Sequence, residues 1–481
     1  MSMLKDFQTD NRFRDHYDCC VIGGGPAGIT VALRLAAGGK RVVLVEGGDV
    51  EYSERSQSLY QCRSTGREAY VDTKRLRMLG GTSNHWAGRC RPMEPSDFTT
   101  ALPNGMSGWP VSYSEIDQYR HEAMRILDLP MKDFDALNPP LSGGDFNADR
   151  YMFSTTRFAN KYAKDLRETP GLDVFVNCNC VDLVFDGKTK RLATATVVDY
   201  AGRRGAVKAK CFVLAMGAIE NARQLLSSNS LAANGVIKAG DLTGSCFMEH
   251  LLVDIGNFVL REDQSTDERQ YYTTDAFVDK HRVGKGNLRF SNITKIKSYG
   301  RTAAVKSFFK NLACSMGIAE KVQVIASFDC PGDGTISTQI EQLPRRQSRI
   351  SLTQDMDALG MRKASIHWDI GEDDIRTIRT IGMEVAKRFA DSGLGYVKLN
   401  QDLMGNPAKL YIHPHAHHMG TTRMASKPGD GVVDDNCKVF GTENLYVAGS
   451  SIFARGGANN PTLPIVQFSL RLADHLKPML R

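Results

Sequence analysis

The chain has no long hydrophobic run, no paired cysteine motif and no concentrated block of one charge. No segment approaches the roughly 18 apolar residues that cross a bilayer, and the first residues, MSMLKDFQTDNRFRDHYD, are polar and contain no apolar leader core. These absences predict a cytoplasmic protein with reduced thiols and without a membrane partner. The sequence carries no signal for the oligomeric state.

The 11 cysteines include no CxxC spacing, so a cysteine-bound metal or cluster is not expected. Cys178 and Cys180 are predicted to share one face of a strand over residues 176–185, because alternate residues of a strand point the same way. We therefore expect no metal in this protein.

The charge balance argues against a nucleic-acid partner. The 61 basic and 54 acidic side chains are spread along the whole chain, and the net charge is only +7. The most basic part, residues 280–310, is interleaved with Gly, Ser and Asn and is interpreted as a solvated insertion. The alternative is a surface that faces an anionic ligand or partner.

Buried strands followed by helices are the main pattern that is present. CCVIG, PAGITVALRLAA and RVVLVE within residues 19–49 predict a strand, a helix and a second strand, which together form a βαβ unit. Similar buried strands at 211–218 and 444–451 are each followed by a helix. With 481 residues and 42% apolar side chains, the chain can form a large core, and this dinucleotide fold is assembled from distant segments.

The intervening segments have the alternation of antiparallel strands. Strands are expected at 323–330, 338–344, 349–353 and 363–370, followed by an amphipathic helix at 372–391. The predicted fold class is α/β (α+β overall), with a discontinuous Rossmann-like dinucleotide-binding domain and a substrate domain whose mainly antiparallel sheet is covered by helices. The predicted boundaries are 15–100, 166–251 and 416–481 for the first domain, and 101–165 and 252–415 for the second.

The GGGPAG turn predicts where a dinucleotide binds. Gly23 permits a tight turn, Gly25 lets the backbone approach a pyrophosphate, and Gly28 allows close packing of helix and strand. Glu46 follows Gly28 by 18 residues, at the end of the next strand, where its carboxylate can accept hydrogen bonds from ribose hydroxyls. This motif alone does not distinguish FAD from NAD.

The segment RMLGGTSNHWAG, residues 77–88, has small residues where a loop must lie flat against a planar group. Together with MGAIENAR, HHMGTTRM and ANNPTLP, it resembles the glucose–methanol–choline (GMC) oxidoreductases over essentially the whole chain. Its GGxSxHW form is similar to the branch of bacterial sugar and polyol dehydrogenases and pyranose oxidases. The resemblance implies bound FAD, contacted by Gly80, Gly81, Thr82, Ser83, Asn84, His85 and Trp86.

Within that branch, the residue matching His85 can be bonded covalently to the flavin 8α-methyl group, so the resemblance allows the same bond here. The alternative is a histidine that only hydrogen-bonds a neighbouring backbone group.

Two residues are expected to carry the catalysis. Oxidation of an alcohol by hydride transfer needs a neutral base and a group that orients the hydroxyl oxygen. The family pattern HxxGT selects His417 as the base, and the Asn-Pro form selects Asn460, rather than Asn459, as the orienting group. The competing candidates are His413, His415 and His418; on an extended strand His413, His415 and His417 would share a face and could bind a metal.

Asn460 and Pro461 are predicted to start the C-terminal helix as N-cap and N1, which would direct its positive end toward the flavin; an ordinary cap is the alternative. The remaining expected contacts with FAD are weaker and come from Val181, Gly217, Gly449, Ser450, Pro461 and Thr462. Gln342 is a further candidate that would project from the substrate sheet.

The predicted function is FAD-dependent oxidation of a CH–OH group, in a sugar, glycoside or polyol, to an aldehyde, ketone or lactone. Oxygen or another acceptor would then reoxidise the flavin. A lyase that uses flavin structurally, a non-catalytic flavoprotein and oxidation of a non-sugar natural product remain the alternatives.

Overall fold

The computed structural model describes residues 4–131, 141–149, 151–238, 240–260, 270–292 and 334–480. The strand expected at 323–330 lies outside these residues, as does the part of the basic segment beyond residue 292.

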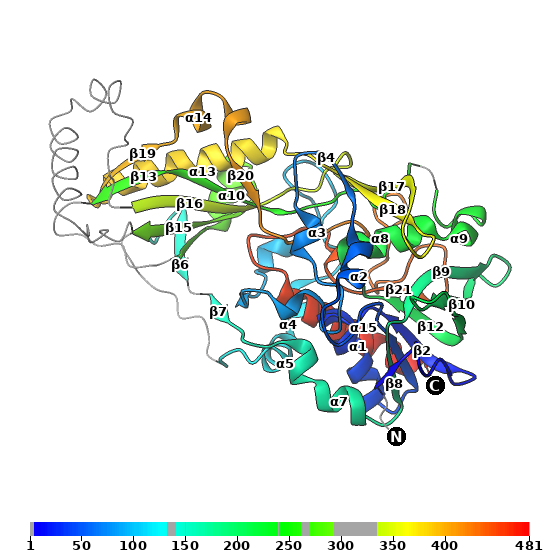
Figure 1. The fold of residues 1–481 in the computed structure, drawn as a ribbon. Coiled ribbons are helices and arrows are strands. Elements are labelled where there is room, and N and C mark those ends of the chain that lie inside the picture. The colour runs from blue at the N-terminus through cyan, green and yellow to red at the C-terminus, as the bar shows by residue number, and fades with distance from the viewer. Residues whose placement is uncertain are drawn as a thin grey trace, which may run out of the picture.

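A six-stranded parallel sheet forms one centre of the molecule (Figure 1). Its order is β1 (Leu4–Asp6), β8 (Leu172–Val176), β3 (Val42–Val45), β2 (Tyr17–Ile22), β12 (Ala209–Leu214) and β21 (Leu445–Val447). Helices α1 (Pro26–Ala37) and α15 (Thr462–Met479) pack against each other beside this sheet, although they lie at opposite ends of the chain. The Rossmann-like arrangement of distant segments is therefore confirmed.

The strand expected over 176–185 is wrong as a single element. The chain leaves the parallel sheet at the end of β8, turns at Asn177, whose φ is 55°, and enters β9 (Asn179–Asp186). β9 belongs to a separate antiparallel sheet with β10 (Arg191–Val198) and β11 (Arg204–Val207). Cys178 lies in the connection, so a continuous alternation with Cys180 does not exist.

A second large sheet is antiparallel and lies at the opposite end of the molecule from the parallel sheet (Figure 1). Its order is β19 (Gly395–Leu399), β13 (His250–Leu260), β16 (Gly334–Glu341), β15 (Gly286–Asn292), β14 (Gln270–Thr273) and β6 (Phe146–Asp149), with β20 (Ile412–Pro414) also paired to β13. Helix α13 (Glu372–Asp391) packs against β19, β13 and β16 through its buried face. The mainly antiparallel sheet covered by a helix is confirmed.

Two of the expected strands form a separate small sheet instead of joining the large one. β17 (Arg349–Met356) pairs with β18 (Arg362–Trp368), and β18 pairs in parallel with β4 (Arg63–Gly66). The shorter strands are β5 (Arg89–Cys90) and β7 (Met152–Phe153). The other helices are α2 (Glu54–Gln57), η1 (Ser58–Tyr60), α3 (Val71–Lys74), η2 (Gly81–Asn84), η3 (Pro95–Phe98), α4 (Tyr113–Asp117), α5 (Arg120–Ile126), α6 (Phe158–Lys161), α7 (Ala163–Glu168), α8 (Gly217–Ser227), α9 (Asn229–Ala233), α10 (Asp275–His281), α14 (Gln401–Met404), η4 (Pro407–Lys409) and η5 (Ser450–Ile452).

The two large sheets have separate hydrophobic cores, one built around the parallel strands and one between the antiparallel sheet and α13. We propose that residues 15–100, 166–251 and 416–481 form the FAD-binding domain and that 101–165 and 252–415 form the substrate domain. α4 and α5 nevertheless pack on α15, so part of 101–165 contacts the first core. Across the described ranges, no helix combines the length and apolar character needed to span a bilayer.

Gly28 offers a test of the βαβ packing. A Cβ at this position would overlap the carbonyl oxygen of Gly23, whereas a Cβ at Gly405 would meet only the Gln401 oxygen at 3.4 Å. We expect Gly28→Ala to lower the melting temperature and the FAD content of the purified protein, because a backbone atom must shift. Gly405→Ala, the matched control, should leave both unchanged, and equal behaviour of the two variants would contradict the packing role.

Candidate active site

A cavity of about 700 Å³ lies at the carboxyl ends of β2, β3, β12 and β21, where ligands bind in open parallel sheets. The predicted site residues that line it are Gly23, Gly25, Glu46, Gly81, Thr82, Ser83, His85, Trp86, Gly217, His417, Gly449, Ser450, Asn460, Pro461 and Thr462. Segments far apart in the sequence therefore meet at one cavity. Gly28, Gly80, Asn84 and Val181 do not line it.

The dinucleotide turn has the geometry that its glycines predict. Gly23 has a φ of 112°, and a Cβ there would lie 2.6 Å from the Ala215 oxygen. A Cβ at Gly25 would meet nothing within 4 Å, so this backbone is open toward a ligand. Gly25 is also the N-cap of α1, whose first backbone N–H groups and positive end favour a phosphate.

Glu46 is held by the backbone of the same turn. Its Oε2 accepts a hydrogen bond from the Gly24 N–H at 2.7 Å, and its Oε1 accepts one from the Gly48 N–H at 2.7 Å. Each carboxylate oxygen can accept more than one hydrogen bond. The carboxylate is thus buried, oriented and still able to accept a hydrogen bond from a ribose hydroxyl.

Residues 77–88, the flavin loop, lie directly on the dinucleotide turn. The Gly80 N–H donates to the Gly24 oxygen at 2.7 Å, and a Cβ at Gly81 would be 3.2 Å from the Gly25 Cα. The Ser83 hydroxyl donates to the Gly80 oxygen at 2.6 Å, and the Trp86 indole donates to the Thr156 oxygen at 2.9 Å. Gly80 and Ser83 therefore shape the loop, while Asn84 donates to the Leu79 oxygen and does not line the cavity.

His85 lies at the cavity wall and is exposed there. Partial burial lowers the pKa of its ring, and a hydrogen bond to the Lys74 backbone opposes this shift. One ring nitrogen thus contacts the backbone, as expected for a histidine that only hydrogen-bonds a neighbouring backbone group. With its lowered pKa, the ring is neutral near pH 7. The other nitrogen remains available for a bond to a ligand.

The FAD contact expected at Val181 is not part of the cavity lining, which neighbouring residues form instead. Cys178, Asn179 and Cys180 line the cavity, whereas Val181, which sequence reasoning had selected, does not. The change of sheet between β8 and β9 brings the connection, rather than the middle of a strand, to the cavity. Gly28 contributes from behind the wall through helix packing.

His417 contacts a second histidine that sequence reasoning missed. Its Nδ1 lies 2.7 Å from Nδ1 of His250, which is the first residue of β13 and is fully buried. The Nε2 of His250 lies 2.7 Å from the carbonyl oxygen of Gly457. Burial, with smaller contributions from His250, His415 and His418, holds the pKa of His417 well below its usual range. The ring is therefore neutral and can accept a proton.

Glu249 supports the same histidines through their backbone. Its Oε2 accepts hydrogen bonds from the N–H groups of His417 at 2.9 Å and His250 at 3.2 Å. Burial raises the pKa of this carboxyl to about 8 and lowers that of His418 to about 3. Oε1 of Glu249 lies 3.2 Å from Nε2 of His418. Because of the shifted pKa values, both groups are mostly neutral at pH 7, and the contact is not an ion pair.

The alternative of a three-histidine metal site is not supported by the geometry. β20 ends at Pro414, and Ala416 has a φ of 62°, so the alternation breaks between His413 and His417. The His413 ring packs edge-on against Tyr411 instead. Among the residues that the structure describes, the group able to hold a metal is Asp145, His281 and Glu384, outside the cavity lining.

Asn460 is not the helix cap that the sequence suggested. α15 begins at Thr462, and Pro461 occupies the N-cap position without a side-chain hydrogen bond, so the Asn460 amide lies one residue too early. Its Oδ1 is buried and, within the described parts of the chain, has no hydrogen-bond partner. The ordinary-cap interpretation is therefore wrong, and the amide faces the cavity as a group available to a ligand.

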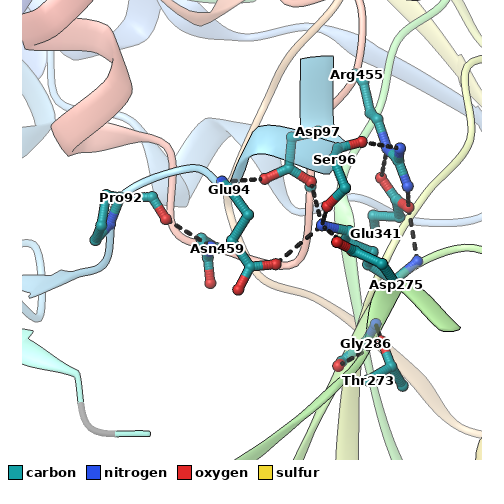
Figure 2. Close-up of polar contacts among 12 residues, drawn as sticks. Pro92, Glu94, Ser96, Asp97, Thr273, Asp275, Gly286, Glu341, Arg455 and Asn459 are labelled. Carbon is teal, nitrogen blue, oxygen red and sulfur yellow. Dashed lines mark hydrogen bonds and ion pairs between the residues drawn. The ribbon is translucent and has the colours of Figure 1, made fainter. Parts of the chain in front are cut away.

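A network of buried charges holds the loop before Asn460 (Figure 2). Arg455 forms an ion pair with Glu341 of β16, with an Nε to Oε2 distance of 2.8 Å, and both side chains are almost completely buried. Lys285 forms ion pairs with Glu94 and Asp97 at 2.9 and 3.0 Å. Although burial opposes it, Arg91 and then Lys285 lower the pKa of Glu94 to about 2.

Asn459 belongs to this support and not to the cavity. Its amide donates to the Pro92 oxygen at 2.9 Å, which agrees with the selection of Asn460 over its neighbour (Figure 2).

Gln342 proves to be structural. Its Oε1 accepts hydrogen bonds from Trp368 at 2.9 Å and from the Glu249 N–H at 3.1 Å, and it does not line the cavity. Its Nε2 donates to the Asp369 oxygen at 2.7 Å. The predicted projection toward the ligand is therefore wrong, because every polar atom of this side chain is used inside the domain.

The cavity fits FAD. It has an open glycine backbone at a helix N-terminus, a buried carboxylate at the end of the second strand and a loop of small residues. A neutral histidine and an amide whose oxygen has no partner among the described residues line the same cavity. These features match a pyrophosphate, a ribose and a planar ring system with a reacting group beside it.

Comparisons with known proteins agree with this fit. Residues 344–469 match the family described as GMC oxidoreductase, and residues 18–237 match the family described as FAD dependent oxidoreductase. The chain is 22% identical to the 2-methyl-1,2-propanediol dehydrogenase of Mycolicibacterium austroafricanum, over 96% of this chain and 95% of that one. It is 24% identical to the fructose dehydrogenase large subunit of Gluconobacter japonicus, over 83% and 80%. The fold is similar to that of pyridoxine 4-oxidase from Mesorbium loti, with a TM-score of 0.59, 18% identity and coverage of 95% and 99%.

The Arg455–Glu341 pair yields a stability prediction. We expect Arg455→Met to lower the free energy of unfolding by about 3 to 5 kcal/mol, because Glu341 would remain buried without its counter-ion. Urea unfolding followed by tryptophan fluorescence measures this change. Adding Glu341→Gln removes the charge but keeps an acceptor for the Lys285 N–H, so the double variant should recover much of the loss. No recovery would contradict the ion-pair interpretation.

Proposed function

The chain belongs to the GMC oxidoreductases and is an FAD-dependent oxidoreductase, and on that premise we propose that it oxidises a CH–OH group with His417 as the base and Asn460 as the orienting amide. One observation supports this most directly. The neutral His417 and Asn460, whose amide oxygen has no partner within the described part of the chain, line the same cavity as the flavin loop and the dinucleotide turn. The product is an aldehyde, a ketone or a lactone.

Each side chain has a distinct part in the reaction. The bare nitrogen of His417 accepts the hydroxyl proton, and the Asn460 Nδ2 donates a hydrogen bond to the same oxygen, which orients the carbon for hydride loss. When bound, FAD supplies an electron-pair acceptor for that hydride at N5. The proton and the hydride leave together as two electrons and two hydrogens, so the alcohol becomes a carbonyl group.

The residues that would hold FAD divide along its length. Gly23, Gly25 and the start of α1 would bind the pyrophosphate, and Glu46 would bind the ribose. Gly217, Gly449 and Ser450 follow the ends of β12 and β21 toward the ring. Pro461 and Thr462 line the cavity at the start of α15, whose N-terminus would stabilise negative charge on the reduced ring.

A sugar, glycoside or polyol is the proposed substrate class. The Asn-Pro form and the His-Trp pair in the flavin loop support it, and two relatives are named for a diol and for fructose. We propose either oxygen or another acceptor for reoxidation. A lyase with a structural flavin is the second candidate: it would also use a neutral histidine, but turnover would leave the flavin oxidised.

The choice between these functions is tested by anaerobic absorption spectra. We expect monosaccharides, glycosides or polyols to bleach the oxidised-flavin band, and admission of oxygen then separates an oxidase from a dehydrogenase. His417→Ala should slow bleaching by at least about 10²-fold, the lower range for removal of a general base, with FAD still bound.

His413→Ala is the matched control, because His413 is exposed, lies on the same segment and does not line the cavity. Undiminished bleaching in His417→Ala would remove this residue as the base, whereas turnover without bleaching would support the lyase.

Covalent attachment through His85 is tested separately. We propose that one of its ring nitrogens bonds the flavin 8α-methyl carbon, because the ring lies at the cavity wall with the other nitrogen near the Lys74 backbone. One hydrogen would leave the methyl carbon and one the imidazole, both as protons, and the electron pair would pass to the flavin and then to the acceptor that reoxidises it. Acid-precipitated protein should then remain yellow, and His85→Ala should release all of its flavin to the supernatant. Complete release from the unaltered protein would exclude the bond.

A further inference from the structure

His250 is the most unusual buried group near the cavity. It has no exposed surface, it does not line the cavity, and both of its ring nitrogens have partners. Its ring meets the His417 ring edge-on, with the centroids 4.9 Å apart and the planes at 84°. The contact therefore joins nitrogen to nitrogen and is not a stacking contact.

The hydrogens in this chain of contacts can be assigned by elimination. The Gly457 carbonyl oxygen can only accept, so His250 Nε2, 2.7 Å away, must carry a hydrogen and donate it. A neutral imidazole has one N–H, which leaves His250 Nδ1 bare as an acceptor. His417 Nδ1, 2.7 Å from that nitrogen, must then be the donor. The nitrogen of His417 left without a hydrogen is Nε2.

We propose that His250 is a positioning residue that, through the Gly457 carbonyl, holds His417 in the tautomer whose Nε2 is bare toward the cavity. The inference rests on the proposed role of His417 as the base. An isolated imidazole exchanges between two tautomers, only one of which presents an acceptor to the substrate hydroxyl. His250 removes the unproductive form before substrate binds.

The surroundings of both rings keep this assignment intact. Burial lowers the pKa of His250 and of His417, so neither ring carries the second hydrogen that would reverse the argument. The other titratable groups that face His417 are His415, His418 and Glu249. Burial lowers the pKa of His415 to about 4, and Glu249 bonds the backbone of His417, not its ring. Nothing else among the described residues competes for Nδ1.

The Gly457 carbonyl begins a chain of hydrogen bonds through His250 to His417, which we call the histidine relay, and this carbonyl is held in place. Gly457 has a φ of 61°, and a Cβ there would lie 3.2 Å from an oxygen of Asp97, the carboxylate paired with Lys285. The 455–460 loop therefore carries Asn460 into the cavity and also presents the oxygen that sets the two histidines. When His417 accepts the hydroxyl proton, its Nδ1–H still points at His250, so the positive charge can be shared over two rings.

The first test reads the tautomer without any reaction. In the FAD-loaded protein labelled with ¹⁵N-histidine, the resonances lost in His417→Ala identify that ring. We expect its Nδ1 to be protonated and its Nε2 to have the shift of a bare imine nitrogen. A protonated Nε2 would overturn the proposal, whatever the activity proves to be.

The second test uses variants of matched size. His250→Asn can place an amide oxygen near the former Nδ1 and accept from His417, whereas His250→Gln reaches toward Gly457 and leaves His417 without its acceptor. We expect anaerobic flavin reduction close to that of the unaltered protein for His250→Asn and a loss of about 10²-fold for His250→Gln and His250→Leu, the size of a misplaced catalytic group. FAD content and melting temperature identify any variant that fails to fold.

The pH profile separates positioning from simple packing. His250 Nδ1 accepts the hydrogen bond from His417 Nδ1 and so favours the protonated form of that ring. Its replacement by Leu should therefore lower the pKa of His417 and move the acid limb of the reduction rate to lower pH. Unchanged rate and acid limb in folded His250→Leu, while His417→Ala is inactive, would overturn the relay. Full activity of His417→Ala would instead overturn the proposed function, and the ¹⁵N spectrum would still report on the relay.

Discussion

The ion pair between Arg455 and Glu341 is the contact on which the geometry of the site depends. Arg455 lies in the loop that leads to the N-terminus of α15, and Glu341 is the last residue of β16, a central strand of the antiparallel sheet. This one ion pair therefore joins the two hydrophobic cores. Neither side chain can be satisfied by water, because both are buried. Either charge left alone would be costly, which favours a single placement of the loop between them.

That placement has consequences on both sides of the loop. Toward the cavity it sets Asn460, and toward the interior it sets the Gly457 carbonyl against His250. The Lys285 cluster extends the same constraint to residues 94–97 (Figure 2). The two parts of the proposed site, a base on one segment and an amide on another, are thus aligned by ion pairs with Lys285 and Glu341, which belong to the antiparallel sheet and its connection.

Local periodicity and glycine chemistry predicted the parts of the structure that are local. Helices α1 and α13 begin and end where their patterns indicated, and the roles of Gly23 and Gly28 follow from atoms that a Cβ would strike. The errors occur where a partner decides. Residues 176–185 divide at Asn177 because the segments on either side of it pair with different sheets. β17 pairs with β18, and β18 pairs with β4, a strand about 300 residues earlier in the chain. The role of His250 could not be predicted for the same reason, because its partners His417 and Gly457 are distant in the sequence and no local pattern indicates the contacts.

The adjacency of the chain ends has a further consequence for the order of folding. β21 is the last strand of the parallel sheet, and α15 packs on α1, where Arg34 binds Asp474 across 440 residues of sequence. Loop closure over such a separation is entropically expensive and slows folding. During synthesis, the nucleotide-binding turn near the N-terminus therefore remains on an incomplete sheet until the C-terminal segment emerges. The part of the cavity wall that follows β21 and begins α15 therefore forms only after residues 445–479 have been synthesised.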